Sequence, residues 1–249
     1  MKRILALTLA VVLCFGLLAF GGCAKKNVLK VGMTDYAPMN FKDDNGEWTG
    51  FDTEFAQKAA KELGYDDVEF IIINWDNKFF ELESGAIDCI WNGMTITDEA
   101  LNNASVSDPY AKNAQVVVMN KADAATYTRD GLKDLTIAVE NGGAAADLLE
   151  SMEITGYTPK TAQTDALMEV KTGASKACLI DVTMANNMLT ADGSYADLVV
   201  VDSLSEEEYG IAFKKGSDLT AKMNDIIMNY KADGTLEALG KKYDVAIAD

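Results

Sequence analysis

The chain has 249 residues, of which 49% are hydrophobic and 24% are charged, a composition typical of a globular protein and not of a disordered one. Its formal net charge of −17 repels nucleic-acid phosphates and anionic lipid headgroups, which argues against both as partners. The sequence contains no histidine, so a Ser-His-Asp or Cys-His nucleophile and a histidine-bearing zinc site are excluded.

The N-terminus has the features of an export signal. Two basic residues follow Met1, residues 4–20 form an apolar run without a charge, and two glycines stand just before Cys23. This order is typical of a secretory signal, and the cysteine resembles the one that bacterial lipoproteins acylate. We therefore expect a lipoprotein signal at residues 1–22, lipid on Cys23 and a tether at residues 23–27, with the protein anchored to the extracytoplasmic face of the cell membrane. A transmembrane anchor is the alternative, because the apolar run has about the minimum length that spans a bilayer.

The segment after the tether predicts one α/β unit. Apolar residues along one helical face predict a helix at residues 51–63, which Gly64 ends. A second helix is expected to start at an Asp76 cap and to end at Gly85. The strands predicted from apolar runs lie at residues 29–33, 68–73 and 87–91. This alternation of strands and helices is typical of a parallel sheet covered by helices.

A second series of elements follows without a low-complexity linker. Its predicted strands lie at residues 115–119, 136–139, 177–180, 198–201 and 209–213. Its predicted helices lie at residues 144–152 and 164–171 and, joined near Gly234, over residues 219–243. The predicted fold class is therefore α/β, with two α/β units in sequence and a helical tail that is free to return to the first unit.

Two cysteines, Cys89 and Cys178, follow the expected lipid-bearing Cys23. Each lies in an apolar run that predicts a buried strand, where a free thiol acts as a small hydrophobic side chain. A disulfide between them is the alternative, since the compartment permits one.

Short motifs occur along the chain in a characteristic order and spacing. They are Val31-Gly32, Tyr36-Ala37-Pro38-Met39-Asn40-Phe41, Gly50-Phe51-Asp52, Trp75-Asp76, Ser84-Gly85-Ala86-Ile87-Asp88, Gly93-Met94-Thr95-Ile96-Thr97, Ser107-Asp108-Pro109-Tyr110, Tyr209-Gly210-Ile211-Ala212 and Lys231-Ala232-Asp233-Gly234-Thr235-Leu236. Together they resemble the polar amino acid family of the solute-binding proteins of bacterial ABC importers, over nearly the whole chain after the signal. The resemblance implies a type II periplasmic binding protein fold, in which two α/β lobes joined by two crossing strands trap a ligand by hinge closure. It implies one lobe at residues 28–112 plus 207–249 and the other at residues 113–206.

The same resemblance implies a ligand site in the cleft between the lobes. Tyr36 and Trp75 match aromatic residues that sandwich the ligand, the loop at residues 92–95 matches one that binds its charged ends, and Asp181 matches the acid that receives its ammonium group. Each position also has a structural interpretation: core packing for the aromatic rings, an ordinary loop, and a helix cap for the acid. The expected ligand-binding residues are Asp35, Tyr36, Trp75, Asn92, Gly93, Met94, Thr95, Ala100, Glu140, Gly143, Ala144 and Asp181.

Two contacts that the family makes to a ligand carboxylate are missing. Its Thr-x-x-Arg motif has Ala100 in place of the arginine, whose planar fork would grip a carboxylate at two points. The one arginine after the signal is Arg129, in a polar connector, and Lys78 or Lys112 offers only a point charge. The family's Gly-Ser/Thr-Thr turn reads Gly142-Gly143-Ala144, which leaves only backbone N–H groups as anion donors or, alternatively, is only a tight helix entry.

The remaining charges of the expected site favour a cation. An unpaired buried carboxylate is costly, so the site should prefer ligands with less negative charge. Asp35, Glu140 and Asp181 would attract a positive group, and Tyr36 and Trp75 would stack on it.

We therefore expect an extracytoplasmic lipoprotein of an ABC importer that captures a small amino-acid-like ligand by cleft closure, as a monomer and without cofactor or metal. Its expected partners are the ligand, the permease subunits and, through the lipid anchor, the membrane. One alternative is a receptor for a cationic amine or a modified amino acid that lacks a free carboxylate. A sensory or scavenging lipoprotein is another, and a lyase that uses Glu140 and Asp181 as general acids is the third.

Overall fold

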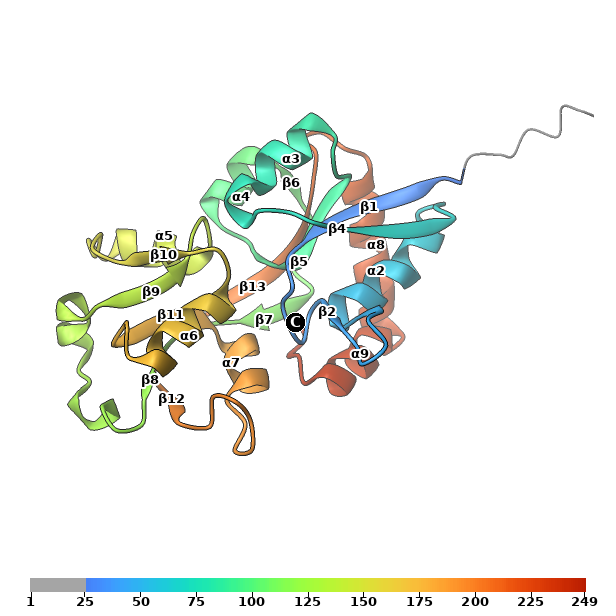
Figure 1. Ribbon diagram of the computed structural model, residues 1–249. Helices are drawn as coiled ribbons and strands as arrows, with labels where there is room; N and C mark the ends of the chain where they lie inside the picture. The colour runs from blue at the N-terminus through green and yellow to red at the C-terminus, as the bar shows by residue number, and fades with distance from the viewer. Residues whose placement is uncertain (1–25) are drawn as a thin grey trace, which may run out of the picture.

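The computed structural model of the protein describes residues 26–249 (Figure 1). The expected signal, Cys23 and most of the tether lie outside the described residues. Two sheets, each with helices around it, form two lobes that lie side by side. The predicted α/β class is confirmed.

The sheet of the first lobe has the strand order β4-β1-β5-β13-β6, and β7 also pairs with β13. Its strands are β1 (Val28–Met33), β4 (Asp67–Ile72), β5 (Cys89–Thr95), β6 (Ser105–Val106), β7 (Ala111–Asn113) and β13 (Glu207–Phe213). The strands β4, β1 and β5 are parallel, as expected, but β13 runs antiparallel to β5, so the sheet is mixed. A separate two-stranded sheet holds β2 (Phe41–Lys42) and β3 (Trp48–Thr49).

The sheet of the second lobe has the order β10-β9-β11-β8-β12. Its strands are β8 (Gln115–Asn120), β9 (Ile137–Glu140), β10 (Thr158–Lys160), β11 (Ala177–Asp181) and β12 (Leu198–Ser203). The chain enters this sheet through Ala114 and leaves it through residues 204–206, and the backbone N–H of Leu204 donates to the carbonyl of Gln115 at 2.9 Å. These two crossings lie side by side; the lobe boundaries given above stay an interpretation.

Helices cover both sheets. They are α2 (Phe51–Glu62), α3 (Lys78–Ser84), α4 (Asp98–Asn103), α5 (Ala144–Ser151), α6 (Gln163–Thr172), α7 (Val182–Met188), α8 (Leu219–Ala232) and α9 (Thr235–Tyr243), with short 3₁₀ turns η1 (Trp75–Asn77), η2 (Ala124–Thr126) and η3 (Arg129–Asp134). The C-terminal helices α8 and α9 pack against α2, so the tail returns to the first lobe as predicted. Within residues 26–249 no helix is long and apolar enough to cross a membrane.

Two local predictions were wrong. Asp76 does not cap a helix: Asn74 accepts its backbone N–H at 3.1 Å to start η1, and α3 begins only at Lys78. Residues 92–95 are not a loop but the second half of β5, because Met94 and Thr95 pair with Gly210 and Tyr209 of β13. That partner strand lies far along the chain, where local sequence gives no sign of it.

The two cysteines are buried and free. Cys89 lies in β5 and Cys178 in β11, in different sheets. Burial raises the pKa of both thiols. They therefore serve as small core side chains, as expected.

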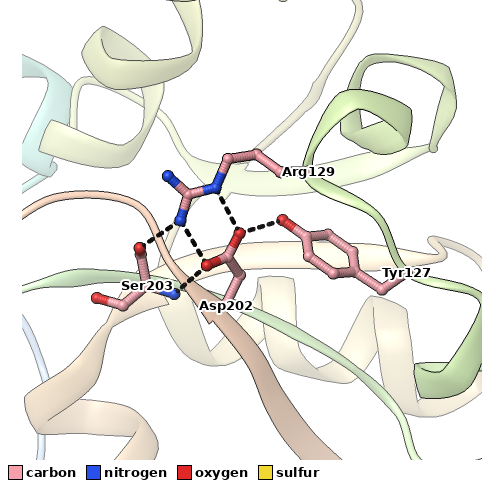
Figure 2. A network of polar contacts seen from close by, with 4 residues as sticks. All are labelled: Tyr127, Arg129, Asp202 and Ser203. Atoms are coloured by element: carbon pink, nitrogen blue, oxygen red, sulfur yellow. Dashed lines mark hydrogen bonds and ion pairs between the residues drawn. The ribbon is translucent and has the colours of Figure 1, made fainter.

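Arg129, the first residue of η3 in the connector between β8 and β9, is hydrogen-bonded to β12 (Figure 2). Its Nε and Nη2 atoms donate to the Asp202 carboxylate at 2.8 and 2.5 Å, and Nη2 also donates to the carbonyl of Ser203 at 2.8 Å. The hydroxyl of Tyr127 donates to the same carboxylate at 2.7 Å. These bonds lower the pKa of Asp202 and occupy the arginine away from the cleft, as predicted.

Candidate ligand-binding cleft

The twelve expected ligand-binding residues all line one cleft. Lys78 and Gly142, which the sequence analysis named as possible partners of a ligand carboxylate, also line it, and the structure adds Thr34, Thr97, Glu99, Gln115, Ala145, Asp147, Ala162, Gln163 and Met184. The cleft is thus built from both lobes. Contact of these residues with a ligand stays a prediction.

Asp181 lies at the end of β11 and is 4% exposed. Its carboxylate accepts hydrogen bonds from the amides of Asn113 (2.7 Å), Gln115 (2.5 Å) and Gln163 (2.6 Å). Its own backbone N–H donates to Gln163 Oε1 at 2.9 Å. Although Asp181 precedes α7, its side chain makes no capping bond, which argues against the helix-cap interpretation.

Gln115 supplies an acceptor without a partner. Its side chain is 1% exposed, and its Nε2 atom is bound to Asp181, but its Oε1 atom has no hydrogen-bond partner in the described chain. A buried acceptor left unpaired carries a free-energy cost, so a group with an N–H or O–H placed here would be stabilised. The sequence signal was a polar residue at the start of the apolar strand β8.

Two tyrosines, Tyr36 and Tyr209, lie close to Asp181. The hydroxyls of Tyr36 and Tyr209 lie 2.7 Å apart, and burial together with the charge of Asp181 raises the pKa of both. Gly93 has a φ of 55°, and a Cβ atom there would lie 2.9 Å from the ring of Tyr36. Tyr36 therefore belongs to both the cleft wall and the core, so its two interpretations do not exclude each other.

The side chain of Asn92 is fully engaged within the first lobe. Its Oδ1 atom accepts the backbone N–H (2.9 Å) and the hydroxyl (2.7 Å) of Thr34, and its Nδ2 atom donates to Asn40 Oδ1 at 2.7 Å. It thereby holds the segment that carries the exposed Asp35 and the buried Tyr36. We expect Asn92 to shape the cleft rather than to bind through its side chain.

Lys78 is the single basic residue among the described residues that line the cleft, and it is 5% exposed. Its Nζ atom donates to the carbonyl of Gly142 at 2.7 Å and lies 3.8 Å from Glu99 Oε2. It also lies 5.3 Å from the ring centroid of Trp75, within cation–π range. Burial lowers the pKa of Lys78.

Lys112 is not a cleft residue. It pairs with Asp249 at 2.7 Å on the surface and does not line the cleft, so its proposed role toward a ligand carboxylate was wrong. The strand β7 that carries it alternates between buried and exposed positions, and Lys112 occupies the exposed one.

The Gly142-Gly143 pair lets the two lobes approach each other. Gly142 has a φ of 67°, and a Cβ atom on it would lie 2.9 Å from the Cα atom of Asp76 in the first lobe. Helix α5 starts directly afterwards at Ala144, with Gly143 as its cap residue. The glycine at position 142 is therefore required by the contact between the lobes as well as by the turn.

Ala100 leaves the arginine position of the motif without a charge. It is buried in a cluster that also holds Trp75 and Met94, and its backbone N–H donates to Thr97 Oγ1 at 3.1 Å to cap α4. The threonine of the motif thus has a structural role, and no guanidinium reaches the cleft from this helix.

Glu140 is a second buried acid, besides Asp181, among the residues that line the cleft. It lies at the end of β9 and is 7% exposed. Burial, and then the charge of Asp181, raises the pKa of Glu140 to about 8, against the opposing effect of Lys78. At neutral pH this side chain is mostly a neutral carboxylic acid that can donate as well as accept a hydrogen bond.

Comparison with known proteins places the chain in a family. Residues 29–245 match the bacterial extracellular solute-binding proteins, family 3. The chain is 31% identical over 224 residues to the L-cystine-binding protein TcyJ of Escherichia coli K12, covering 88% of this chain and 83% of TcyJ. It is 28% identical over 254 residues to the arginine-binding extracellular protein ArtP of Bacillus subtilis, covering 98% of each.

A solved structure shows the same fold. A substrate-binding protein of an ABC uptake transporter from Streptococcus pneumoniae, with bound histidine, superposes with a TM-score of 0.81 at 27% identity, covering 88% of this chain and 94% of that one. The predicted type II periplasmic binding protein fold is confirmed. These relatives are binding proteins, and none of them supports the lyase alternative. The chain belongs to the bacterial extracellular solute-binding proteins of family 3, the polar amino acid-binding proteins of ABC transporters.

Proposed function

We propose that this protein is the lipid-anchored receptor of an ABC importer and that it captures a small amino-acid-like ligand with a positively charged group. The observation that carries the proposal is the unpaired, buried Oε1 atom of Gln115 next to the Asp181 carboxylate. An ammonium or guanidinium group has both the charge for the carboxylate and a spare N–H for the amide oxygen. The names of the relatives, which bind cystine, arginine and histidine, agree with a ligand of amino acid type.

The balance of charge in the cleft supports a cation. Besides Lys78, the ionisable lining residues are the acids Asp35, Glu99, Asp147 and Asp181, together with Glu140, whose raised pKa of about 8 keeps it mostly neutral at pH 7. A buried charge is tolerated only with a partner, and a cationic ligand supplies one. An anionic ligand would instead meet one lysine that already donates to Gly142.

Closure of the cleft is supported by contacts between the lobes. Lys78 of the first lobe donates to Gly142 of the second, and Gly142 lies against Asp76. Ligand bound between the lobes would make contacts in the closed state that the open state lacks, and would therefore shift the protein toward closure.

A second candidate is a cationic amine without a carboxylate. Ala100, Gly143 and Ala144 place no side-chain donor where the family binds a carboxylate, and Lys78 stands beside Glu99. The loss of a charge-assisted bidentate contact is worth roughly 1.5–3 kcal/mol, or about ten- to hundredfold in affinity.

Titration calorimetry with matched pairs separates the two candidates. The pairs are L-arginine and agmatine, L-lysine and cadaverine, and L-histidine and histamine, which differ by the carboxylate alone. Binding of a cationic amino acid at least tenfold tighter than its amine supports the amino acid receptor, whereas equal or tighter binding of the amine supports the second candidate. Tightest binding of L-glutamate or L-aspartate would overturn both.

A further inference from the structure

Glu207 does not line the cleft, but it accepts hydrogen bonds from the cleft residues Thr95 and Gln115. It is the first residue of β13 and follows the return crossing at residues 204–206. Its carboxylate accepts the hydroxyls of Thr95 and Ser205, each at 3.1 Å. Glu207 instead lines a neighbouring hollow, which shares Thr95 and Thr97 with the cleft and whose other charged residues are Lys112, Glu206, Glu208 and Asp249.

Two amide side chains join Glu207 to the cleft carboxylate of Asp181. The Nε2 atom of Gln115 donates to Asp181 Oδ1 at 2.5 Å and to Glu207 Oε2 at 3.0 Å. The Nδ2 atom of Asn113 donates to the same two oxygens at 2.7 and 3.3 Å. Because an amide nitrogen carries two hydrogens, each amide gives one to the cleft acid and one to Glu207.

This sharing fixes the direction of the Gln115 amide. A carboxylate only accepts hydrogen bonds, so two carboxylates on one side hold the Nε2 atom there. The Oε1 atom is then the end of the amide that stays unpaired. Without the Glu207 carboxylate, one of the two N–H groups of Gln115 loses its charged acceptor. Only the hydrogen bond to Asp181 then fixes the orientation of the amide.

The two carboxylates also affect each other electrostatically. Burial, and then the charge of Asp181, raises the pKa of Glu207. Two like charges held close together in a partly buried site repel each other. A cation bound at Asp181 offsets that repulsion. The charge of Glu207 therefore increases the affinity of the site for a positive ligand, although Glu207 does not touch it.

We propose that Glu207 is a positioning residue of the ligand site, which orients the Asn113 and Gln115 amides and ties Asp181 to the return crossing between the lobes. The inference rests on the function proposed above. Glu207 acts through Asp181 and Gln115 and does not touch the ligand. Because Glu207 directly follows the return crossing at residues 204–206, its hydrogen bonds through Asn113 and Gln115 connect Asp181 to that crossing.

The first test measures binding of L-arginine and agmatine by calorimetry to wild type, Glu207→Gln and Glu206→Gln. The control removes the same charge from the neighbouring exposed residue. We expect Glu207→Gln to weaken binding of the tighter probe by about tenfold and Glu206→Gln to leave it within about twofold. Equal effects of both variants, or none, would overturn the proposal.

The second test needs no ligand and follows thermal unfolding from pH 4 to pH 9. A carboxyl whose pKa is raised in the folded state stabilises at low pH and loses that stabilisation as pH rises through its folded pKa. Glu207→Gln removes this loss, so its melting temperature should gain on wild type as pH rises. The gain should be smaller in an Asp181→Asn background, because the repelling charge is gone.

The two tests together separate positioning from damage to the fold. A variant that binds less because it is misfolded would also melt lower, whereas the proposal expects weaker binding with higher stability at neutral pH. A shift in melting temperature that is the same at every pH, or the same with and without Asp181→Asn, would contradict the role of Glu207. Absence of binding of all six compounds of the matched pairs to wild type would count against the proposed function instead, and the unfolding test alone then decides the inference.

Discussion

The Nζ atom of Lys78 donates a 2.7 Å hydrogen bond to the carbonyl of Gly142, which belongs to the opposite lobe. Lys78 comes from the start of α3 and Gly142 from the turn before α5, so the bond joins the two lobes at the cleft that both residues line. The same ammonium lies over the ring of Trp75. A buried lysine without such partners would be costly, which ties its burial to the closed arrangement.

Replacing Lys78 by methionine should shift the protein toward the open state. Methionine keeps the apolar stem against Trp75 but removes the bond to Gly142. We expect a larger radius of gyration in small-angle scattering of the ligand-free protein. Lys112→Met is the control, because Lys112 pairs with Asp249 outside the cleft. Identical scattering from both variants and wild type would show that this bond does not hold the lobes together.

Substitution of Gly142 by alanine should weaken ligand binding by preventing full closure. The new Cβ atom would lie 2.9 Å from the Cα atom of Asp76, closer than real contacts allow. Gly173→Ala is a matched control, since Gly173 also has a positive φ, of 77°, but nothing lies within 4 Å of a Cβ atom there. Both variants should lose about 1 kcal/mol of stability from the left-handed backbone.

Calorimetry then distinguishes the contact from the backbone cost. Gly142→Ala should lose at least tenfold in affinity for the tightest cationic ligand, whereas Gly173→Ala should bind like wild type. If both bind equally well, the lobes do not need this approach to hold a ligand.

Binding of a cation should strengthen as pH rises through the pKa of Glu140. Because this pKa is raised to about 8, the side chain is mostly neutral at pH 7 and mostly charged at pH 9. If the charged form binds the ligand, affinity should rise by about tenfold over this range. Glu140→Gln should remove the dependence, and a wild-type affinity that is flat from pH 6 to pH 9 would exclude Glu140 as a charge partner.

The same group affects stability in the opposite direction. Its folded pKa lies above the unfolded value, so its stabilising effect is complete below the unfolded pKa, near 4.5, and is lost as pH rises through about 8. Wild type should therefore lose stability relative to Glu140→Gln between these pH values. Thermal unfolding of both proteins over pH 4–9 measures this, and parallel curves would be the contrary result.

Replacing Asp181 by asparagine should weaken a cationic ligand by roughly ten- to hundredfold, because a charged hydrogen-bond acceptor is lost from a buried site. Asp192→Asn removes the same charge from an exposed position in the same lobe and should have little effect. Calorimetry with L-arginine and agmatine compares the variants. Comparable losses in both would point to a general effect of net charge rather than to a contact at Asp181.

The anchor has its own test, since Cys23 lies outside the described residues. Cys23→Ser should leave the precursor unprocessed or release the protein from membranes, because the acylated thiol would be missing. Fractionation of cells followed by detection of the protein measures both outcomes. Normal processing with membrane retention would favour an apolar transmembrane anchor instead.

The sequence allowed most of the fold and the position of the site to be predicted, because strand and helix patterns are local and the motifs occur at characteristic spacings. Its limits appear where distant segments meet. Residues 92–95 look like a loop until β13 pairs with them. Gly142 looks like a helix entry until Asp76 of the other lobe lies against it.

Polar residues on the crossing strands were the main omission. Gln115 and Asn113 sit beside apolar strand residues, and only the folded structure brings Asp181 and Glu207 to either side of their amides. Lys112 shows the reverse, because its charge pointed to the cleft whereas its strand position places it on the surface. The direction of each side chain decides whether it faces the cleft, as Gln115 does, or the surface, as Lys112 does, and this direction depends on how the strands pair in the folded protein.

The most direct measurement is mass spectrometry of the molecule released from protein purified in its folded state without added ligand. The arrangement of Gln115, Asp181 and Glu140 predicts a small cationic molecule of amino acid type, with an ammonium or guanidinium group and no net negative charge. Recovery of an arginine-like or amine compound, bound one to one and chemically unchanged, would agree with it. Recovery of an anionic molecule such as glutamate, or of a neutral sugar, would contradict it.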